Sequence, residues 1–177
     1  KPIKRANGVF HLSYHSRFLV DFFKQLGALP VIAEFKRVPS SLFGATEDAV
    51  VGFLSALFTA DGTMALGRNN TAYIRLTSKS RLMLQDVQRL LLGLGINSAI
   101  YDRSRCQRSS FTYDAANGEH RQYFSDGICF ELQISREDIP RFIDGVGFLD
   151  DRYSGIITQL HNRPRGFYKQ RAIDIVK

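Results

Sequence analysis

The stretch that decides the fold is VGFLSALFTADGT, residues 51–63. It lies in an expected helix from Ala49 to Ala60, and small side chains recur along one face of that helix. Small residues let two helix backbones approach closely, and a glycine inside a helix costs about 1 kcal/mol relative to alanine. The pattern therefore predicts a helix–helix interface formed by Gly52, Ser55, Ala56 and Thr59.

An acidic residue, Asp61, follows directly at the C-terminal end of this helix. The negative end of the helix dipole repels a carboxylate there by about 0.3–1 kcal/mol, and a bound cation would reverse that sign. A structural explanation is also open, because Asp-Gly is a common helix-ending turn and small residues are common in helix packing. The motif alone does not decide between the two interpretations.

The segments downstream predict a regular order of helices and strands. Thr46 is a candidate N-cap, with Glu47 and Asp48 in the first turn. Ser78 or Ser80 is expected to start the next helix. From residue 46 the order α-β-β-α-β-β-α predicts an α+β fold, with helices on one antiparallel sheet. The expected strands are 64–66, 72–77, 98–105, 107–113 and 127–134; the expected later helices are 80–94, 136–146 and 150–160; residues 114–126 are expected to form a polar loop.

A weak internal repeat links the N-terminal region to the end of this unit. When the chain is shifted by about 120 residues, the same order recurs: a strand at 9–12, a helix at 16–26 and a glycine that ends the helix. Chance similarity between two strand–helix units is an alternative explanation. Phe35 to Pro39 is expected to be extended. We therefore predict the end of a first half in 1–43, a complete second half in 44–160 and a C-terminal extension in 161–177.

The charge is unevenly distributed. The net charge is +7, and residues 63–113 carry eight basic against two acidic side chains, whereas residues 114–152 carry four against nine. Basic charge thus collects where strands are expected, which favours a DNA-binding face over an evenly solvated surface.

Four blocks resemble the LAGLIDADG homing endonucleases of inteins. Residues 53–63 resemble the second motif of that family, and residues 74–100 resemble the strand, helix and Gly-Ile turn that follow it. The block 36–39 resembles the family's Lys-x-(Ile/Val)-Pro segment, and 146–149 resembles its late Ile-Gly-Phe block. The four blocks occur in the family's order, and the resemblance covers about residues 9–160.

The resemblance implies a LAGLIDADG fold, in which αββαββα halves pack helices on a saddle-shaped, DNA-binding antiparallel sheet. It also implies phosphodiester hydrolysis that depends on Mg²⁺ or Mn²⁺. Asp61 would be both catalytic residue and metal ligand, and Lys36 would polarise the attacking water or stabilise charge on the phosphorane. Alignment of the repeats places Arg152 near the position of Lys36, where it would serve the other half-site, although Asp150 and Asp151 crowd it.

The chain also departs from the family pattern. It has no first motif with a second catalytic acid, and Thr59 stands where the family usually has aspartate. A two-acid site would then need a missing first half, a partner or a second copy bound through the helix 49–60. The segment 161–177 faintly resembles the return into an intein splicing domain. Splicing by this chain is not expected, because Arg163 and Pro164 follow His161-Asn162.

Double-stranded DNA is the expected partner of the sheet. Arg, Asn and Gln can read base edges in the major groove from a two-stranded ribbon, while a solvated face with ordinary charges is the structural alternative. The candidate DNA-contacting residues are Arg68, Asn69 and Asn70 at a turn, Tyr73, Arg75 and Thr77 on one strand, Tyr101, Arg103 and Arg105 on the next, and Arg108 and Gln133 beside them.

Other classes are less favoured by the composition. No apolar run approaches the ~20 residues of a membrane span, and Cys106 and Cys129 lack the spacing of a zinc site and fit reduced thiols of a cytoplasmic protein. Two alternative functions remain open. One is a DNA-binding regulator with this fold that has lost cleavage, and the other is an RNA maturase.

Overall fold

The computed structural model describes residues 3–4, 10–11, 15–66, 72–106, 111–114, 118–123, 126–135 and 137–161. Its centre is a four-stranded antiparallel sheet in the order β3-β4-β8-β5. The strands are Gly62–Leu66 (β3), Ala72–Ser78 (β4), Ala99–Asp102 (β5) and Phe130–Ser135 (β8). This is the α+β layer that the sequence predicts.

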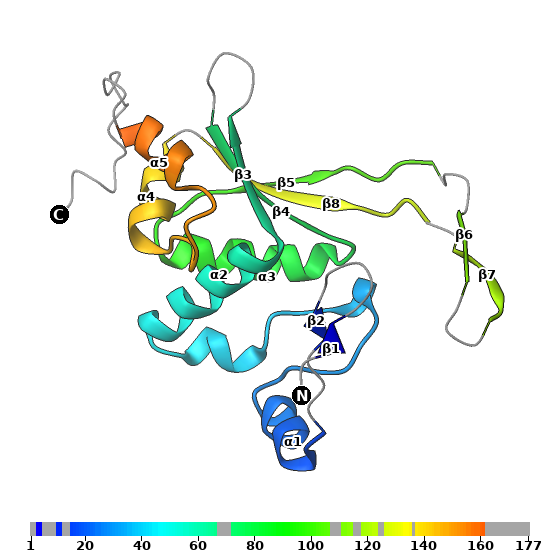
Figure 1. Ribbon diagram of the computed structural model, residues 1–177. Coiled ribbons are helices and arrows are strands. Elements are labelled where there is room, and N and C mark those ends of the chain that lie inside the picture. Colours follow the sequence, from blue (N-terminus) through cyan, green and yellow to red (C-terminus); the bar gives the residue numbers. More distant parts are fainter. Residues whose placement is uncertain are drawn as a thin grey trace.

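Helices cover one face of that sheet and leave the other open (Figure 1). Helices α2 (Glu47–Asp61) and α3 (Arg81–Gly93) lie across the covered face, and α4 (Asp138–Gly145) also packs on it beside α5 (Ser154–His161). The helix predicted to start at Ser80 does so, because the Ser80 hydroxyl accepts a hydrogen bond from Met83 N at 3.1 Å. Thr46 is the N-cap of α2 by position, but its side chain makes no capping hydrogen bond.

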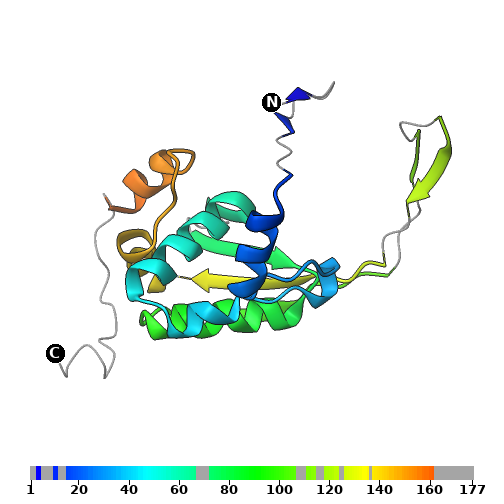
Figure 2. The same cartoon turned by 90° about the horizontal axis from the view of Figure 1, so that it is seen from below.

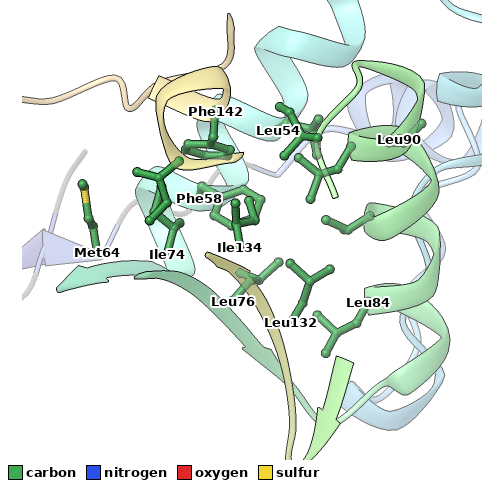
Figure 3. Packing of buried hydrophobic residues seen from close by; sticks show 14 of the residues in the cluster. Leu54, Phe58, Met64, Ile74, Leu76, Leu84, Leu90, Leu132, Ile134 and Phe142 are labelled. Atoms are coloured by element: carbon green, nitrogen blue, oxygen red, sulfur yellow. The ribbon is translucent and has the colours of Figure 1, made fainter. Parts of the chain in front are cut away.

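The hydrophobic core lies between the helices and the covered face (Figure 3). Side chains alternate along β4 and β8, so that every second residue points toward the helices. Phe58 of α2 and Phe142 of α4 meet edge to face, with ring centroids 4.8 Å apart. The fully buried strand residues beneath them are Ile74, Leu76, Leu132 and Ile134.

A second hairpin corrects the prediction of a polar loop at 114–126. Strands β6 (Phe111–Asp114) and β7 (His120–Tyr123) pair antiparallel with each other. They lie beyond the ends of β5 and β8 and away from the helices (Figure 2). The sequence of β7, His-Arg-Gln-Tyr, has no apolar alternation that would predict a strand.

The N-terminal region contributes a short strand pair, β1 (Ile3–Lys4) and β2 (Phe10–His11), and helix α1 (Arg17–Gln25). Ser16 caps α1 by accepting from Leu19 N at 3.3 Å. The apolar face of α1 is exposed, and Phe18 is 89% exposed. The predicted extended segment begins one residue late, because Phe35 ends a 3-10 helix, Ala33–Phe35, before Lys36 becomes extended.

None of the helices within the described residues has both the length and the apolar character needed to cross a membrane.

Candidate nucleic-acid interface

The open side of the sheet, called here the outer face, carries the side chains that point away from the helices. Register places Arg75 opposite Gln133, and Thr77 and Tyr101 on either side of Glu131. The ladder between β5 and β8 continues past their ends, because Arg103 N and Arg105 N donate to Cys129 O and Gly127 O at 2.8 and 2.9 Å. The outer face is therefore one continuous surface over β4, β8 and β5.

This surface is hollowed, with a cavity of about 720 Å³. Five predicted DNA-contacting residues line it together, although they come from β4, β8 and the segment that follows β5. The lining residues are Tyr73, Arg75, Arg103, Arg105, Cys106, Gly127, Ile128, Cys129, Glu131 and Gln133. Three arginines in one concave site attract a polyanion.

One carboxylate lies at the centre of these arginines. Glu131 is only 8% exposed. Its Oε1 accepts from Nη2 of Arg103 at 3.3 Å, and its Oε2 lies 3.6 Å from Nη1 of Arg75. Glu131 is not among the site residues predicted from the sequence, where its one signal is its position between Cys129 and Gln133 in the outward-facing alternation.

Each of the paired arginines also lies near a tyrosine ring. The guanidinium carbon of Arg75 is 5.7 Å from the ring centre of Tyr73, and that of Arg103 is 5.0 Å from the ring centre of Tyr101. These are cation–π distances. Arg68, Asn69, Asn70 and Arg108, which were predicted to contact DNA, lie outside the described residues.

Asp61 is the last residue of α2, and it is exposed. The strand begins at once with Gly62, where a Cβ atom would collide with the backbone of Phe58, so the junction requires glycine. Tyr153 donates a hydrogen bond from its hydroxyl to Gly62 O at 3.3 Å. The backbone at the Asp61–Gly62 junction is thus held by the tight turn at Gly62 and by the segment that precedes α5.

The small residues of α2 separate into two groups. Gly52 and Ala56 are exposed. Ser55 is buried in the core of this chain, and the Thr59 hydroxyl donates to Ser55 O at 2.6 Å and accepts from Leu149 N at 2.8 Å. The exposed small-residue face, defined here as Ala49, Gly52, Ala56 and Ala60, has the spacing of a helix surface that a second backbone could approach.

Lys36 is exposed, and contacts of its carbonyl and of the next residue hold the backbone on its C-terminal side. Its carbonyl accepts from the Ser80 hydroxyl at 2.7 Å, and the next residue, Arg37, donates from Nη2 to Asp86 Oδ1 at 2.8 Å. Asp86 is 1% exposed. Because Gly62 pairs with Leu76, and Ser80 follows four residues later, Lys36 and Asp61 both lie toward the same end of β4.

A family model described as a LAGLIDADG-like domain matches residues 48–147, which is more than half of the chain. The chain belongs to the LAGLIDADG family. The matched region begins in the first turn of α2 and ends just beyond α4. It therefore contains both Asp61 and the outer face.

Several curated proteins share this LAGLIDADG segment. The replicative DNA helicase DnaB of Rhodothermus marinus is 27% identical over 145 residues, which are 80% of this chain and 14% of that protein. A DNA polymerase of Thermococcus sp. (strain GE8) is 34% identical over 135 residues, 76% of this chain and 7% of that protein. The ribonucleoside-diphosphate reductase NrdEB subunit alpha of Bacillus subtilis is 36% identical over 96 residues, 53% of this chain and 9% of that protein. The chain thus spans a small part of each relative.

Arg152, the third predicted catalytic residue, is held by a neighbour. Its Nε donates to Oδ2 of Asp150 at 2.8 Å, and this hydrogen bond lowers the pKa of Asp150. The adjacent Tyr153 contacts Gly62, so Arg152 lies in the segment that packs against the Asp61 end of α2. Its guanidinium is about half exposed but already carries a carboxylate partner.

The described acidic residues do not by themselves form the ligand set that a metal ion needs. Within the described part of the chain, no group of three or more His, Cys, Asp or Glu side chains could hold a metal ion together. Asp61 fits as one ligand, because an exposed carboxylate at the negative end of a helix dipole favours a cation. The remaining ligands would be DNA phosphate oxygens, water and a carboxylate from elsewhere.

Proposed function

We propose that this LAGLIDADG chain is part of a site-specific double-stranded DNA endonuclease, a homing endonuclease that hydrolyses phosphodiester bonds with Mg²⁺ or Mn²⁺. The observation that carries the proposal is the outer face. Arg75, Arg103, Arg105 and Gln133 are gathered on the one side of the sheet that no helix covers, in a family whose members cut DNA. A concave antiparallel sheet of this kind fits against a duplex groove.

The proposed reaction is hydrolysis by water. The water oxygen forms a bond to phosphorus and loses a proton to solvent, one P–O ester bond breaks, and the leaving oxygen gains a proton from solvent. Asp61 would hold a divalent cation, which would supply Lewis acidity, and would orient the water. Lys36 stabilises the charge that develops on the phosphoryl oxygens. Arg152 takes part only if it leaves Asp150, so we assign it the weaker role of contacting phosphate at the other half-site.

A complete site needs a second carboxylate. The exposed small-residue face of α2 is the surface through which that acid would be supplied, because residues without bulk permit a second helix to lie against it. The occupant would be the first half of the fold, preceding the region 44–160, or a second copy of this chain. Either arrangement places two helix ends, and two acids, next to each other, and a cation between them relieves their repulsion.

We also propose that the chain is encoded within an intein. The relatives named above catalyse unrelated reactions, yet they share this one segment, which occupies at most 14% of their length. A segment common to such different enzymes is explained by an insert that carries its own activity. An intein splicing domain is the host that this interpretation implies, with residues 161–177 as the connection to it.

A cleavage assay on a randomised duplex library tests the nuclease proposal. We expect sequence-specific cuts that require Mg²⁺, disappear in Asp61→Asn and persist in Asp48→Asn, an exposed acid at the opposite end of the same helix. Cutting by Asp61→Asn at the wild-type rate would reject the role of Asp61.

A second candidate function is a DNA-binding regulator that does not cleave. It is favoured by the hydrogen bonding of Thr59 and the pairing of Arg152 with Asp150, because both residues are occupied within this chain. Specific, salt-sensitive binding to duplex DNA without Mg²⁺-dependent cuts, even when a first half is supplied, would support the regulator over the nuclease.

A further inference from the structure

We propose that Glu131 is a positioning residue that makes Arg75 and Arg103 readers of guanine bases instead of contacts to phosphate. The inference rests on the proposed function, because it concerns how the outer face recognises duplex DNA. It assigns a role to a buried acid of the outer face that the proposed cleavage reaction does not use.

The geometry of the three side chains is the starting point. Glu131 lies on the central strand β8, and its side chain is 10% exposed, whereas those of Arg75 and Arg103 are 42% and 53% exposed. The two carboxylate oxygens are divided between the arginines, Oε1 facing Arg103 and Oε2 facing Arg75. A single acid therefore restrains two guanidinium groups from below while their outer edges stay open to the cavity.

The donors that remain free match a base edge. Arg103 uses Nε and Nη2 toward Glu131, at 3.4 and 3.3 Å. That leaves its Nη1 edge for a partner outside. An arginine fork presented to the major groove pairs with guanine O6 and N7, which is the commonest specific contact in protein–DNA complexes. Tyr73 and Tyr101 further limit where the two guanidinium groups can go.

Electrostatics favours guanine over phosphate as the target of Arg75 and Arg103. A free surface arginine gains most from a phosphate, which is why such contacts dominate DNA interfaces. The negative charge of Glu131 repels a phosphate brought to the same place but leaves a neutral guanine edge acceptable. Arg105 lies on the same face, and no ion pair between it and Glu131 is seen in the described residues, so we assign it to phosphate.

The shared carboxylate limits the spacing of the two guanines. Nη2 of Arg103 lies 3.3 Å from Oε1 of Glu131, and Nη1 of Arg75 lies 3.6 Å from Oε2. The two guanidinium groups therefore converge on Glu131, although their backbones lie beside different residues of β8. The two nitrogens are within roughly 9 Å of each other, which at a rise of about 3.4 Å for each base pair corresponds to guanines no more than about two to three base pairs apart.

The test compares Glu131→Gln with Glu47→Gln, which makes the same charge change at an exposed residue on the helical side. Each chain selects from a random duplex library in EDTA, so that no DNA is cut, and bound sequences are counted. For wild type and Glu47→Gln we expect two guanine positions no more than about two to three base pairs apart, each preferred roughly 10- to 100-fold. Glu131→Gln should lose both preferences.

A salt titration distinguishes positioning from simple structural damage. Arginines released from Glu131 can move to phosphates, so the slope of log K against log [salt] should steepen by about 1–2 in Glu131→Gln. Arg75→Ala and Arg103→Ala should each lose one guanine position, whereas Arg105→Ala should weaken binding to all sequences alike.

Two results would overturn this inference and leave the proposed function standing. One is that the sequences selected by wild type contain no such pair of guanines. The other is that Glu131→Gln keeps both guanine preferences, either at the wild-type affinity or with an affinity lowered by the same factor for every sequence. Wild type that fails to bind duplex DNA at all would instead overturn the proposed function, and the inference with it.

Discussion

Truncation of Phe58 to alanine should be among the most costly single changes in this chain. Phe58 is 0% exposed and lies on the last turns of α2, three residues before Asp61. Its ring meets Phe142 edge to face at an interplanar angle of 63°. Phe142 in turn lies near Phe148, which contacts Tyr153 with ring centres 4.7 Å apart. The change therefore weakens the packing that fixes the end of α2.

The expected magnitude follows from burial. Phenylalanine-to-alanine changes in cores cost about 3–5 kcal/mol, through lost transfer free energy and the cavity left behind. The aromatic pair with Phe142 accounts for about 0.5–1.5 kcal/mol of that. For a chain of this length, each kcal/mol lowers Tm by about 2–4 °C, so the variant should melt roughly 6–20 °C below wild type.

Urea unfolding followed by circular dichroism measures this, with Phe18→Ala as the matched control. The control removes the same ring from a side chain that is 89% exposed. Its free energy of unfolding should stay within about 0.5 kcal/mol of wild type. Equal losses in the two variants, or a loss below about 1 kcal/mol in Phe58→Ala, would refute the description of the core.

Three further predictions concern the junction between α2 and β3, the hydrogen bond between Thr59 and Leu149, and the ion pair between Lys79 and Asp126. Gly62→Ala should lower Tm markedly, because a Cβ has no room against the preceding helical turn; an unchanged Tm in thermal unfolding would contradict this. Thr59→Val should cost about 0.5–1.5 kcal/mol of unfolding free energy in urea, because Leu149 N loses its acceptor, and a smaller loss would show that the contact is dispensable. The hydrogen bond from Lys79 lowers the pKa of Asp126 below its ordinary 3.8, and the same bond raises the pKa of Lys79 above its ordinary 10.5. The ion pair should therefore contribute its full stability between pH 3.8 and pH 10.5. That contribution is lost as pH falls through the folded-state pKa of Asp126 or rises through the folded-state pKa of Lys79. In Lys79→Met this part of the pH dependence of unfolding should disappear, and unfolding free energies that match wild type at every pH would contradict the prediction.

The sequence predicted the layered core because its periodicities are strong there. Alternation along 72–77 and 127–134 identified β4 and β8, and the serine cap and glycine stop bounded α3. A strand was expected at 107–113, where β6 begins at Phe111, but β7 was missed because its sequence, His-Arg-Gln-Tyr, has no apolar alternation. Periodicity reports burial, so it is informative only where a helix covers the strand.

Only part of the candidate site could be predicted from the sequence. Five residues of the outer face could be selected because basic and amide side chains alternate with core residues on single strands. Glu131 could not, because its role depends on Arg75 and Arg103, which are 56 and 28 positions away in the sequence. The residue types along α2 likewise do not reveal which face of the helix is buried. Ser55 and Gly52 look alike as small residues, yet one is buried in the core and the other is exposed.

The central claim is that duplex DNA binds on the outer face of the sheet, and fluorescence anisotropy with a short duplex at 50–200 mM salt tests it most directly. The variants are Arg105→Ala, on the outer face, and Arg89→Ala, on α3, where the side chain is 69% exposed. We predict that Arg105→Ala weakens binding and reduces the slope of log K against log [salt] by about 0.9, while Arg89→Ala behaves as wild type. Equal weakening by Arg89→Ala, or unchanged binding by Arg105→Ala, would contradict the account.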